Sequence, residues 1–210
     1  MKSIEIDLVS DVVCPWCAVG YYRLKRAADK LGIELLIHWH PFELNPNMPA
    51  EGEDLYDHFM NKYRMSAEQT NGLGATLKRY GAPLGFEFNY PQGNRMRNTF
   101  KVHQLLAWAK PQKAETRLYE ALFTAYFTHQ QDIASTEVLR DIIESVDLNR
   151  DEAQSILSQN LFAESVREKE RKWMDKGIDA VPTMIFPGPQ RVGGAQPLEH
   201  YEQLLLAASK

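Results

Sequence analysis

Cysteine is nearly absent from this sequence: its 210 residues include only two, Cys14 and Cys17, separated by two residues. So small a number excludes a scaffold held together by several disulfides. It also leaves a structural zinc site short of ligands, because such sites usually take four. What this single pair does is therefore the main question that the sequence raises.

Strongly basic segments and long apolar runs are also missing. The net charge is −4, and residues 167–172 alternate Lys and Arg with Glu, which is typical of a solvated helix face. No apolar stretch reaches the roughly 20 residues that cross a bilayer. The first residues lack the apolar core and cleavage site of a secretory signal. We therefore expect no nucleic-acid partner, no membrane association and a cytoplasmic location.

The start of the chain has the pattern of a strand, a helix and a second strand. Residues 4–9 begin with alternating apolar and acidic side chains. Apolar positions 17, 21, 24, 28 and 31 then recur with helical spacing, and Gly32 follows as a natural helix stop. Residues 33–42 are rich in branched and aromatic side chains, as in a strand. This order indicates parallel pairing with a right-handed crossover.

The rest of the chain divides at two places. Residues 41–52 are rich in proline and polar side chains, and a boundary is expected there. Residues 53–177 have a mostly helical pattern, after which "AVPTMIFPG" and "RVGG" predict two short strands and "LEHYEQLLLAA" a closing helix. We therefore predict an α/β domain made of residues 1–52 and 178–210, interrupted by a helical domain at 53–177.

Within the helical region, local signals predict where helices begin. Ser66 and Gln69 have the spacing of a capping box. Arg95, Arg97 and Asn98 mark an expected helix start, with Asn98 as a cap, and could bind an anionic group on a substrate. Solvated arginines at a capped helix explain the same pattern, and we favour that simpler explanation.

Three explanations compete for the cysteine pair. A redox dithiol needs an attacking thiolate and a second thiol close enough to resolve the mixed disulfide, and a C-x-x-C beside a strand–helix–strand pattern favours it. Cys17 lies on the apolar stripe of the helix, so we expect it to be buried. Cys14 lies at the helix tip, where the dipole lowers a thiol pKa, and we expect it to be exposed. A metal pair assisted by His38 and His40, and two buried cysteines in a core, stay open as alternatives.

Four segments, "SDVVCPWC", "HPFELNPNMP", "AVPTMIF" and "GGAQP", together resemble the DsbA-like thioredoxin-fold superfamily, and most of all its cytoplasmic FrnE-type branch. The resemblance implies a thioredoxin fold with a large helical insertion between the second and third strands. It implies a thiol–disulfide oxidoreductase in which Cys14 attacks and Cys17 resolves. Its substrate would be a protein or small-molecule thiol or disulfide, and no resident cofactor or metal is expected.

The resemblance also implies that Pro182 follows a cis peptide bond and faces the dithiol, and that the backbone of Val181 pairs with the substrate. Substrate contacts are accordingly expected at Pro15, Trp16, Val181 and Pro182. DsbA itself has histidine at the position of Trp16, and tryptophan supplies no positive charge to the thiolate. We therefore expect a disulfide less oxidising than that of DsbA, whose reduction potential is roughly −120 mV.

A glutathione-dependent enzyme is the alternative function. The same superfamily contains 2-hydroxychromene-2-carboxylate isomerases and kappa-class glutathione transferases, which typically have serine at the position of Cys14 and lack the second cysteine. The presence of both cysteines here favours disulfide exchange, with glutathione as a candidate redox partner. The sequence does not indicate the oligomeric state or the direction of electron flow.

Other residues have simple structural explanations. Asp11 is expected to be a solvent-exposed loop acid rather than a helix cap or a group that tunes a proton. His38 and His40 are expected to have packing or surface roles. Core or inter-helix packing is expected of Trp39, Trp108 and Trp173, and the methionines at 48, 60, 65 and 96 have no spacing that requires a substrate groove.

Overall fold

The computed structural model describes residues 2–89 and 93–209, and it divides the chain into two compact units. The first unit contains the residues up to 44 and those from 167 onward, and the second contains residues 45–166. The boundaries expected from the sequence, 52/53 and 177/178, lie later in the chain. The difference at the second boundary arises because Trp173, in the last expected helix of the insertion, packs with Val9 and Ile178 of the first unit.

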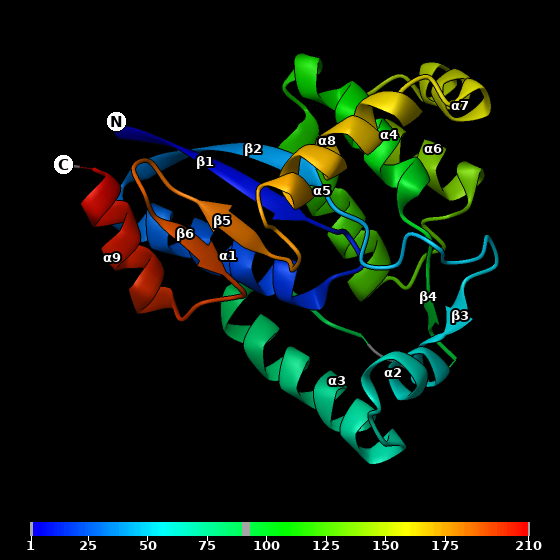
Figure 1. Cartoon of the computed structure of the whole chain (residues 1–210), viewed down its shortest axis with the longest axis horizontal. Coiled ribbons are helices and arrows are strands. Elements are labelled where there is room, and N and C mark those ends of the chain that lie inside the picture. Colours follow the sequence, from blue (N-terminus) through cyan, green and yellow to red (C-terminus); the bar gives the residue numbers. More distant parts are fainter. Residues whose placement is uncertain (1, 90–92, 210) are drawn as a thin grey trace. The chain divides into compact units, whose positions relative to one another are not determined.

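The first unit contains a four-stranded mixed sheet with the strand order β2-β1-β5-β6 (Figure 1). β1 pairs with β2 in parallel and with β5 antiparallel, and β5 pairs with β6 antiparallel. The predicted thioredoxin-type sheet is confirmed. Its elements are β1 (Lys2–Ser10), α1 (Pro15–Leu31), β2 (Ile33–Pro41), β5 (Thr183–Ile185), β6 (Arg191–Gly193) and α9 (Leu198–Ala208).

Helix α1 begins and ends where the sequence predicts. Cys14 is its N-cap, and Pro15 occupies the first helical position, where a missing N–H leaves no hydrogen bond unmade. Gly32 ends the helix in the left-handed conformation, with φ of 66°, and its N–H donates to the Ala28 and Asp29 carbonyls. The dithiol therefore lies at the start of a well-terminated helix.

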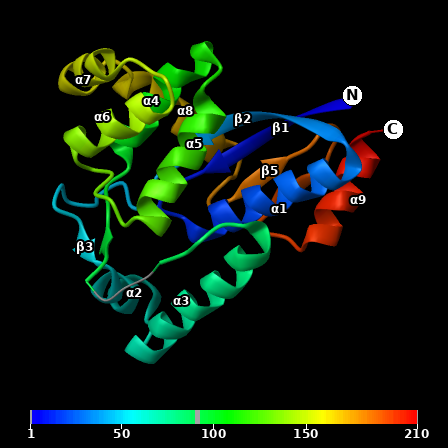
Figure 2. The same cartoon turned by 180° about the vertical axis from the view of Figure 1, so that it is seen from behind.

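The two faces of the sheet are covered by different helices. α1 and α9 contact each other, and in Figure 2 α1 lies in front of the strands. α1 faces the side of β5 that carries Met184, because a Cβ built on Gly20 would lie 3.3 Å from Met184 Cε. On the opposite face, Trp173 of α8 (Ala163–Asp175) packs with Val9 and against the ring of His40. The dithiol helix is thus fixed on one side of the sheet by α9.

The second unit is mostly helical, as predicted, with one small sheet that the sequence pattern does not indicate. Its helices are α2 (Leu55–Tyr63), α3 (Ala67–Gly81), α4 (Phe100–Ala109), α5 (Glu115–Phe123), α6 (Thr136–Ser145) and α7 (Arg150–Gln159), with 3-10 turns η1 (Ala82–Leu84) and η2 (Lys110–Gln112) and the π-helical turn η3 (Thr124–Thr128). Two strands, β3 (Glu53–Asp54) and β4 (Arg95–Met96), pair antiparallel.

Two local predictions in this unit concern the starts of helices. The capping box is confirmed, because Ser66 Oγ accepts the Gln69 N–H while the Gln69 side chain accepts the Ser66 N–H. The expected cap at Asn98 is also confirmed, because α4 begins at Phe100 and the Phe100 N–H donates to Asn98 Oδ1 at 3.0 Å. Arg95, which was expected at the same helix start, belongs instead to the short strand β4. The sequence pattern misses this strand because two residues are too short for an alternating signal.

Aromatic side chains form much of the core of the second unit. Phe88 and Phe123 each lie against Phe127, with ring centroids 5.2 Å and 6.1 Å apart. Tyr126 and Phe86 extend the same cluster. Among the described residues, none of the helices combines the length and the apolar composition needed to cross a bilayer.

Candidate active site

The turn that joins β1 to α1 brings the two sulfur atoms together. The Cys14 N–H donates to the Asp11 carbonyl at 3.1 Å, which closes the turn before the helix. Cys14 Sγ in turn accepts the N–H of Cys17 at 3.3 Å, so the sulfur of the first cysteine caps the helix that carries the second. Both cysteines are free thiols. The Cys14 sulfur therefore lies at the positive end of the helix dipole and accepts one of the N–H groups that have no partner within the helix.

Cys17 is fully buried, as its place on the helical stripe predicts. Burial raises the pKa of the Cys17 thiol well above its usual range, and a hydrogen bond to the Cys14 sulfur and the charge of that sulfur raise it further. A backbone hydrogen bond from Asp11 and the side chain of Ser10 act in the opposite direction. The two sulfurs therefore differ, because Cys17 holds its proton in the resting molecule.

Cys14 is also buried, at 3% exposure, and the expectation of an exposed sulfur is wrong. Its Sγ lies under the backbone of the loop before β5, donating to the Val181 carbonyl oxygen at 3.7 Å. The peptide bond between Val181 and Pro182 is cis. Local sequence patterns could not indicate this cover, because residues 14 and 181 are far apart in the chain; only the family resemblance implied that Pro182 faces the dithiol.

The other residues expected to contact the substrate differ in how far they are exposed to solvent. Trp16 is 36% exposed, Pro15 and Val181 are half-buried, and Pro182 is buried. Two contacts fix Pro182 in place. Its carbonyl accepts the Gly194 N–H at 2.7 Å, and its ring lies 3.4 Å from a Cβ built on Gly20. Trp16 thus offers the largest exposed apolar side chain beside the two sulfurs.

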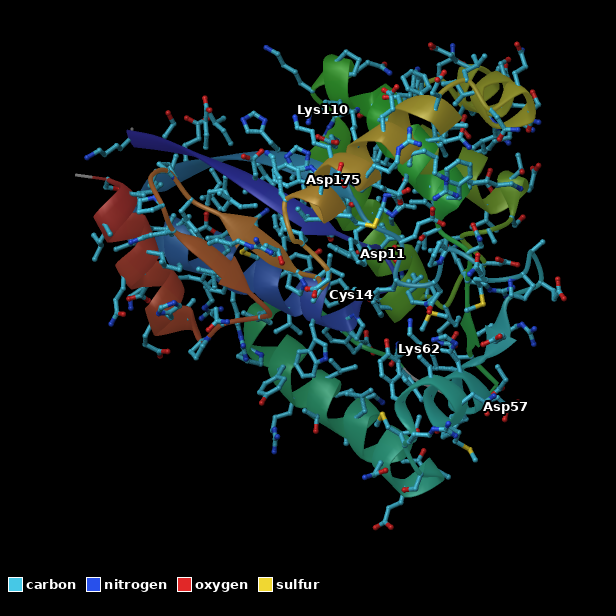
Figure 3. The ribbon with its side chains drawn as sticks, in the orientation of Figure 1. Asp11, Cys14, Asp57, Lys62, Lys110 and Asp175 are labelled. Carbon is cyan, nitrogen blue, oxygen red and sulfur yellow. The ribbon has the colours of Figure 1, made fainter. Side chains whose placement is uncertain are left out.

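Asp11 is not the exposed loop acid that the sequence suggested; it is fully buried (0% exposed). One of its carboxylate oxygens, Oδ2, accepts the backbone N–H of Leu44 at 2.8 Å. Figure 3 labels Asp11 and Cys14 close to where β1 passes into α1. This hydrogen bond offsets part of the cost of burying the carboxylate, and it joins the end of β1 to the chain that leaves the parallel strand β2.

Tyr201, whose hydroxyl lies next to Gly20 of α1, and its partner Gln196 were not singled out in the sequence. The Tyr201 hydroxyl oxygen accepts the Gln196 N–H at 3.2 Å, and the Arg23 guanidinium donates to the Gln196 carbonyl at 3.0 Å. Burial raises the pKa of Tyr201 to about 12. The only sequence signal was the spacing of Tyr201 with Leu204 and Leu205, which marks the buried stripe of α9.

The two histidines pair with acids on β1. His40 Nε2 lies 2.6 Å from Asp7 Oδ1, and His38 Nε2 lies 3.6 Å from Glu5 Oε2. The packing and surface roles expected of these histidines account for both positions. Burial of the three tryptophans expected in the core is confirmed, with exposures of 2%, 4% and 6% for Trp39, Trp108 and Trp173.

The arginines and methionines singled out in the sequence belong mainly to internal contacts of the second unit. Arg95 and Arg97 each donate to the Glu51 carbonyl, and Arg97 also pairs with Asp132 at 3.1 Å. Met48 and Met96 are buried, whereas Met60 is 47% exposed. Bonds inside the unit therefore occupy the guanidinium groups for which an anionic substrate was considered.

Solved structures and a curated relative resemble the chain along nearly its full length. A probable DsbA oxidoreductase from Streptomyces coelicolor has a TM-score of 0.89 at 27% identity, covering 98% of this chain and 89% of that one. The uncharacterized protein YwbO of Bacillus subtilis is 24% identical over 97% of this chain and 96% of its own. A 2-hydroxychromene-2-carboxylate isomerase shares the fold, with a TM-score of 0.70 at 18% identity over 97% of this chain and 95% of that one.

The fold by itself therefore does not separate disulfide exchange from glutathione-dependent isomerisation, since a structure named for each lies among the similar ones. A family model is more specific. The model of the DSBA-like thioredoxin domain matches residues 5–206, which include both cysteines and the Val181–Pro182 segment. This chain accordingly belongs to the DSBA-like thioredoxin domain family.

Proposed function

We propose that the protein is a thiol–disulfide oxidoreductase of the FrnE type that exchanges disulfides through Cys14 and Cys17. The observation that carries the proposal is the hydrogen bond from the Cys17 N–H to Cys14 Sγ at 3.3 Å, at the N-cap of α1. This arrangement places the sulfur of Cys14 at the positive end of the helix, which is where the attacking sulfur of a redox dithiol lies. The second thiol lies one helical turn away, which is the separation that disulfide exchange requires.

The reaction proceeds in two exchanges. The Cys14 thiolate attacks one sulfur of a substrate disulfide, forming a mixed disulfide and releasing the other sulfur as a thiolate. Cys17 then attacks Cys14 Sγ while its proton passes to a released substrate thiolate; this forms the Cys14–Cys17 disulfide, breaks the mixed disulfide and releases the second substrate sulfur. Two electrons pass from the dithiol to the substrate, and the same steps in reverse oxidise a substrate dithiol. A thiol such as glutathione would restore the reduced dithiol.

The asymmetry between the two sulfurs supports these roles. Because burial holds the proton on Cys17, this thiol does not compete with Cys14 for the first attack. The Val181 carbonyl beside Cys14 Sγ, at 3.7 Å, lies where the backbone of a bound thiol compound could be held. Trp16, exposed next to it, supplies an apolar surface for the substrate. The substrate class we propose is accordingly a protein or small-molecule disulfide, and cytoplasmic action stays a prediction.

Trapping of the mixed disulfide tests the proposal. Cys17→Ala removes the resolving thiol, so partners should accumulate as covalent adducts on Cys14, detected by mass spectrometry of the non-reduced protein purified from cells. The matched control, Cys14→Ser, should yield no adducts and should lose disulfide exchange by at least about a thousandfold. Full activity of Cys17→Ala without adducts would contradict the assigned roles. Glutathione-dependent isomerase activity that persists in Cys14→Ser would favour the alternative function.

A further inference from the structure

The carboxylate of Asp11 is a buried polar group next to the dithiol that the two exchange steps do not use. Its residue is fully buried, three positions before Cys14. A buried carboxylate requires strong partners, because desolvation of the charge is costly. One such partner is the Leu44 N–H, which donates to Oδ2 at 2.8 Å. This bond joins the end of β1 to the chain that follows β2.

The backbone of the same residue contacts both cysteines. Its carbonyl oxygen accepts the Cys14 N–H at 3.1 Å, and its backbone also forms a hydrogen bond with Cys17. The position of the Asp11 peptide groups therefore affects where the Cys14 turn lies relative to the buried sulfur. A shift of this turn changes the approach of Cys17 Sγ to Cys14 Sγ, which is the geometry of the resolving step.

The other end of the bond is also held in place. Glu43, which precedes Leu44, accepts a hydrogen bond from the Arg167 guanidinium, and this guanidinium also donates to Glu170 Oε2 at 2.8 Å. The side chains of Glu43 and Glu170 are 2% and 7% exposed. The Leu44 amide is thus a donor on an anchored segment, and Asp11 ties the dithiol turn to it.

We propose that Asp11 is a positioning residue for the resolving step, acting as the hydrogen-bond acceptor that holds the Cys14 turn against the chain after β2. The proposal rests on the proposed function, since it concerns the attack of Cys17 on a mixed disulfide at Cys14. It assigns the effect to the accepted hydrogen bond from Leu44, so an uncharged acceptor of the same shape can replace the carboxylate.

Single-turnover reaction of the reduced protein with dithiobis(nitrobenzoate), a chromogenic aromatic disulfide, separates the two steps. Attack by Cys14 releases one nitrothiobenzoate, and resolution by Cys17 releases the second. Asp11→Ala should slow the second release by at least about tenfold while changing the first by less than about threefold. Asp11→Asn, whose Oδ1 can still accept the Leu44 N–H, should restore the second release to within about threefold of the wild type.

A nearby acid provides the matched control. Asp7 lies on β1, pairs with His40 and has a side chain that is 40% exposed, so Asp7→Ala removes a negative charge from the same strand without touching the dithiol turn. Both releases should stay within about twofold of the wild type in this variant. If Asp11→Ala does not fold, as judged by far-UV circular dichroism, Asp11→Ser replaces it, because a serine hydroxyl is too short to reach Leu44.

The outcomes distinguish this inference from the function on which it rests. If Asp11→Asn is as slow as Asp11→Ala, the charge or a proton on the carboxylate is required, and the hydrogen-bond role is wrong. If both Asp11 variants match the wild type while Cys17→Ala releases only one nitrothiobenzoate, the positioning role alone fails. If Cys14→Ser, through Cys17 alone, releases one nitrothiobenzoate as fast as the wild type makes its first release, the proposed function itself fails.

Discussion

Burial changes the acidity of single side chains, as the Cys17 thiol in α1 and the Tyr201 phenol in α9 show. In both, removal from water raises the pKa, because the core stabilises the neutral form. The charge of one also opposes ionisation of the other, since Cys17 contributes to the raised pKa of Tyr201. The core around the dithiol therefore retains protons at a pH where the unfolded chain would release them.

Tyr201 gives a prediction for alkaline pH. Its pKa is raised from 10.0 in the unfolded chain to about 12 in the folded state, so its contribution to stability is fully present below pH 10 and is lost as the pH rises toward 12. By about pH 11 the free energy of unfolding should have fallen by about 1 kcal/mol through this group. The effect should be absent in Tyr201→Phe.

Urea unfolding of the wild type and Tyr201→Phe at about pH 8 and about pH 11 measures this difference. The variant starts less stable, because it leaves the Gln196 N–H without the hydroxyl oxygen that accepts it. The free energy of unfolding should nevertheless fall less in the variant than in the wild type between the two pH values. An equal fall in both proteins would show that Tyr201 does not hold its proton as described.

At the scale of elements, the packing of α1 against β5 and α9 depends on a glycine in the middle of a helix. Glycine there normally weakens a helix by roughly 1 kcal/mol relative to alanine. At Gly20, however, a Cβ would lie 3.3 Å from Met184 Cε, 3.3 Å from the Tyr201 hydroxyl and 3.4 Å from Pro182 Cγ. Close approach of these three elements therefore outweighs helix propensity at this position.

A pair of glycine substitutions tests this packing. Gly20→Ala should lower the free energy of unfolding by about 1 kcal/mol, because the cost of overpacking exceeds the gain in helix propensity. Gly72→Ala, in α3, should raise it by about 0.5–1 kcal/mol, because nothing lies within 4 Å of the Cβ that is added. Urea unfolding of both variants checks the opposite signs. Stabilisation of both would mean that the neighbours of Gly20 move aside at little cost.

At the scale of the whole molecule, the chain passes between the two units at 44/45 and at 166/167. An ion cluster of Glu43, Arg167 and Glu170 lies next to these two unit boundaries. Two of its members are almost fully buried carboxylates, and the Arg167 side chain is 42% exposed. One guanidinium pairs with both carboxylates. The cluster therefore joins the two segments of the first unit, the end of the first segment at Glu43 and the start of the second at Arg167.

Removal of the guanidinium should therefore be costly. Arg167→Met leaves two buried carboxylates without their shared cation and should lower the free energy of unfolding by about 2–3 kcal/mol, measured by urea unfolding. The double variant with Glu43→Gln should recover part of this loss, because it removes one of the two charges.

Lys30→Met is the control for that experiment. It breaks the Lys30–Glu202 pair, in which the lysine side chain is 63% exposed, and should cost less than about 1 kcal/mol. A loss from Arg167→Met no larger than that from Lys30→Met would contradict a structural role for the cluster.

Much of the fold could be predicted because its signals are local. The stripe from Cys17 to Leu31, the stop at Gly32 and the capping box at Ser66 each involve residues within one element, and all three appear in the structure. β4 could not be predicted, since a two-residue strand has no period of its own. The boundaries of the helical insertion are difficult for a related reason: α8 begins in one unit and ends in the other, with no break in its helical pattern.

For the site, the two cysteines, their place at the start of a helix and the burial of Cys17 follow from local sequence signals, because helical periodicity and the C-x-x-C spacing are properties of one short segment. The burial of Cys14 beneath Val181 and the hydrogen bond from Leu44 to Asp11 depend instead on the folded chain. These contacts join residues separated by 167 and 33 positions in the chain, so they exist only once the sheet brings their strands together.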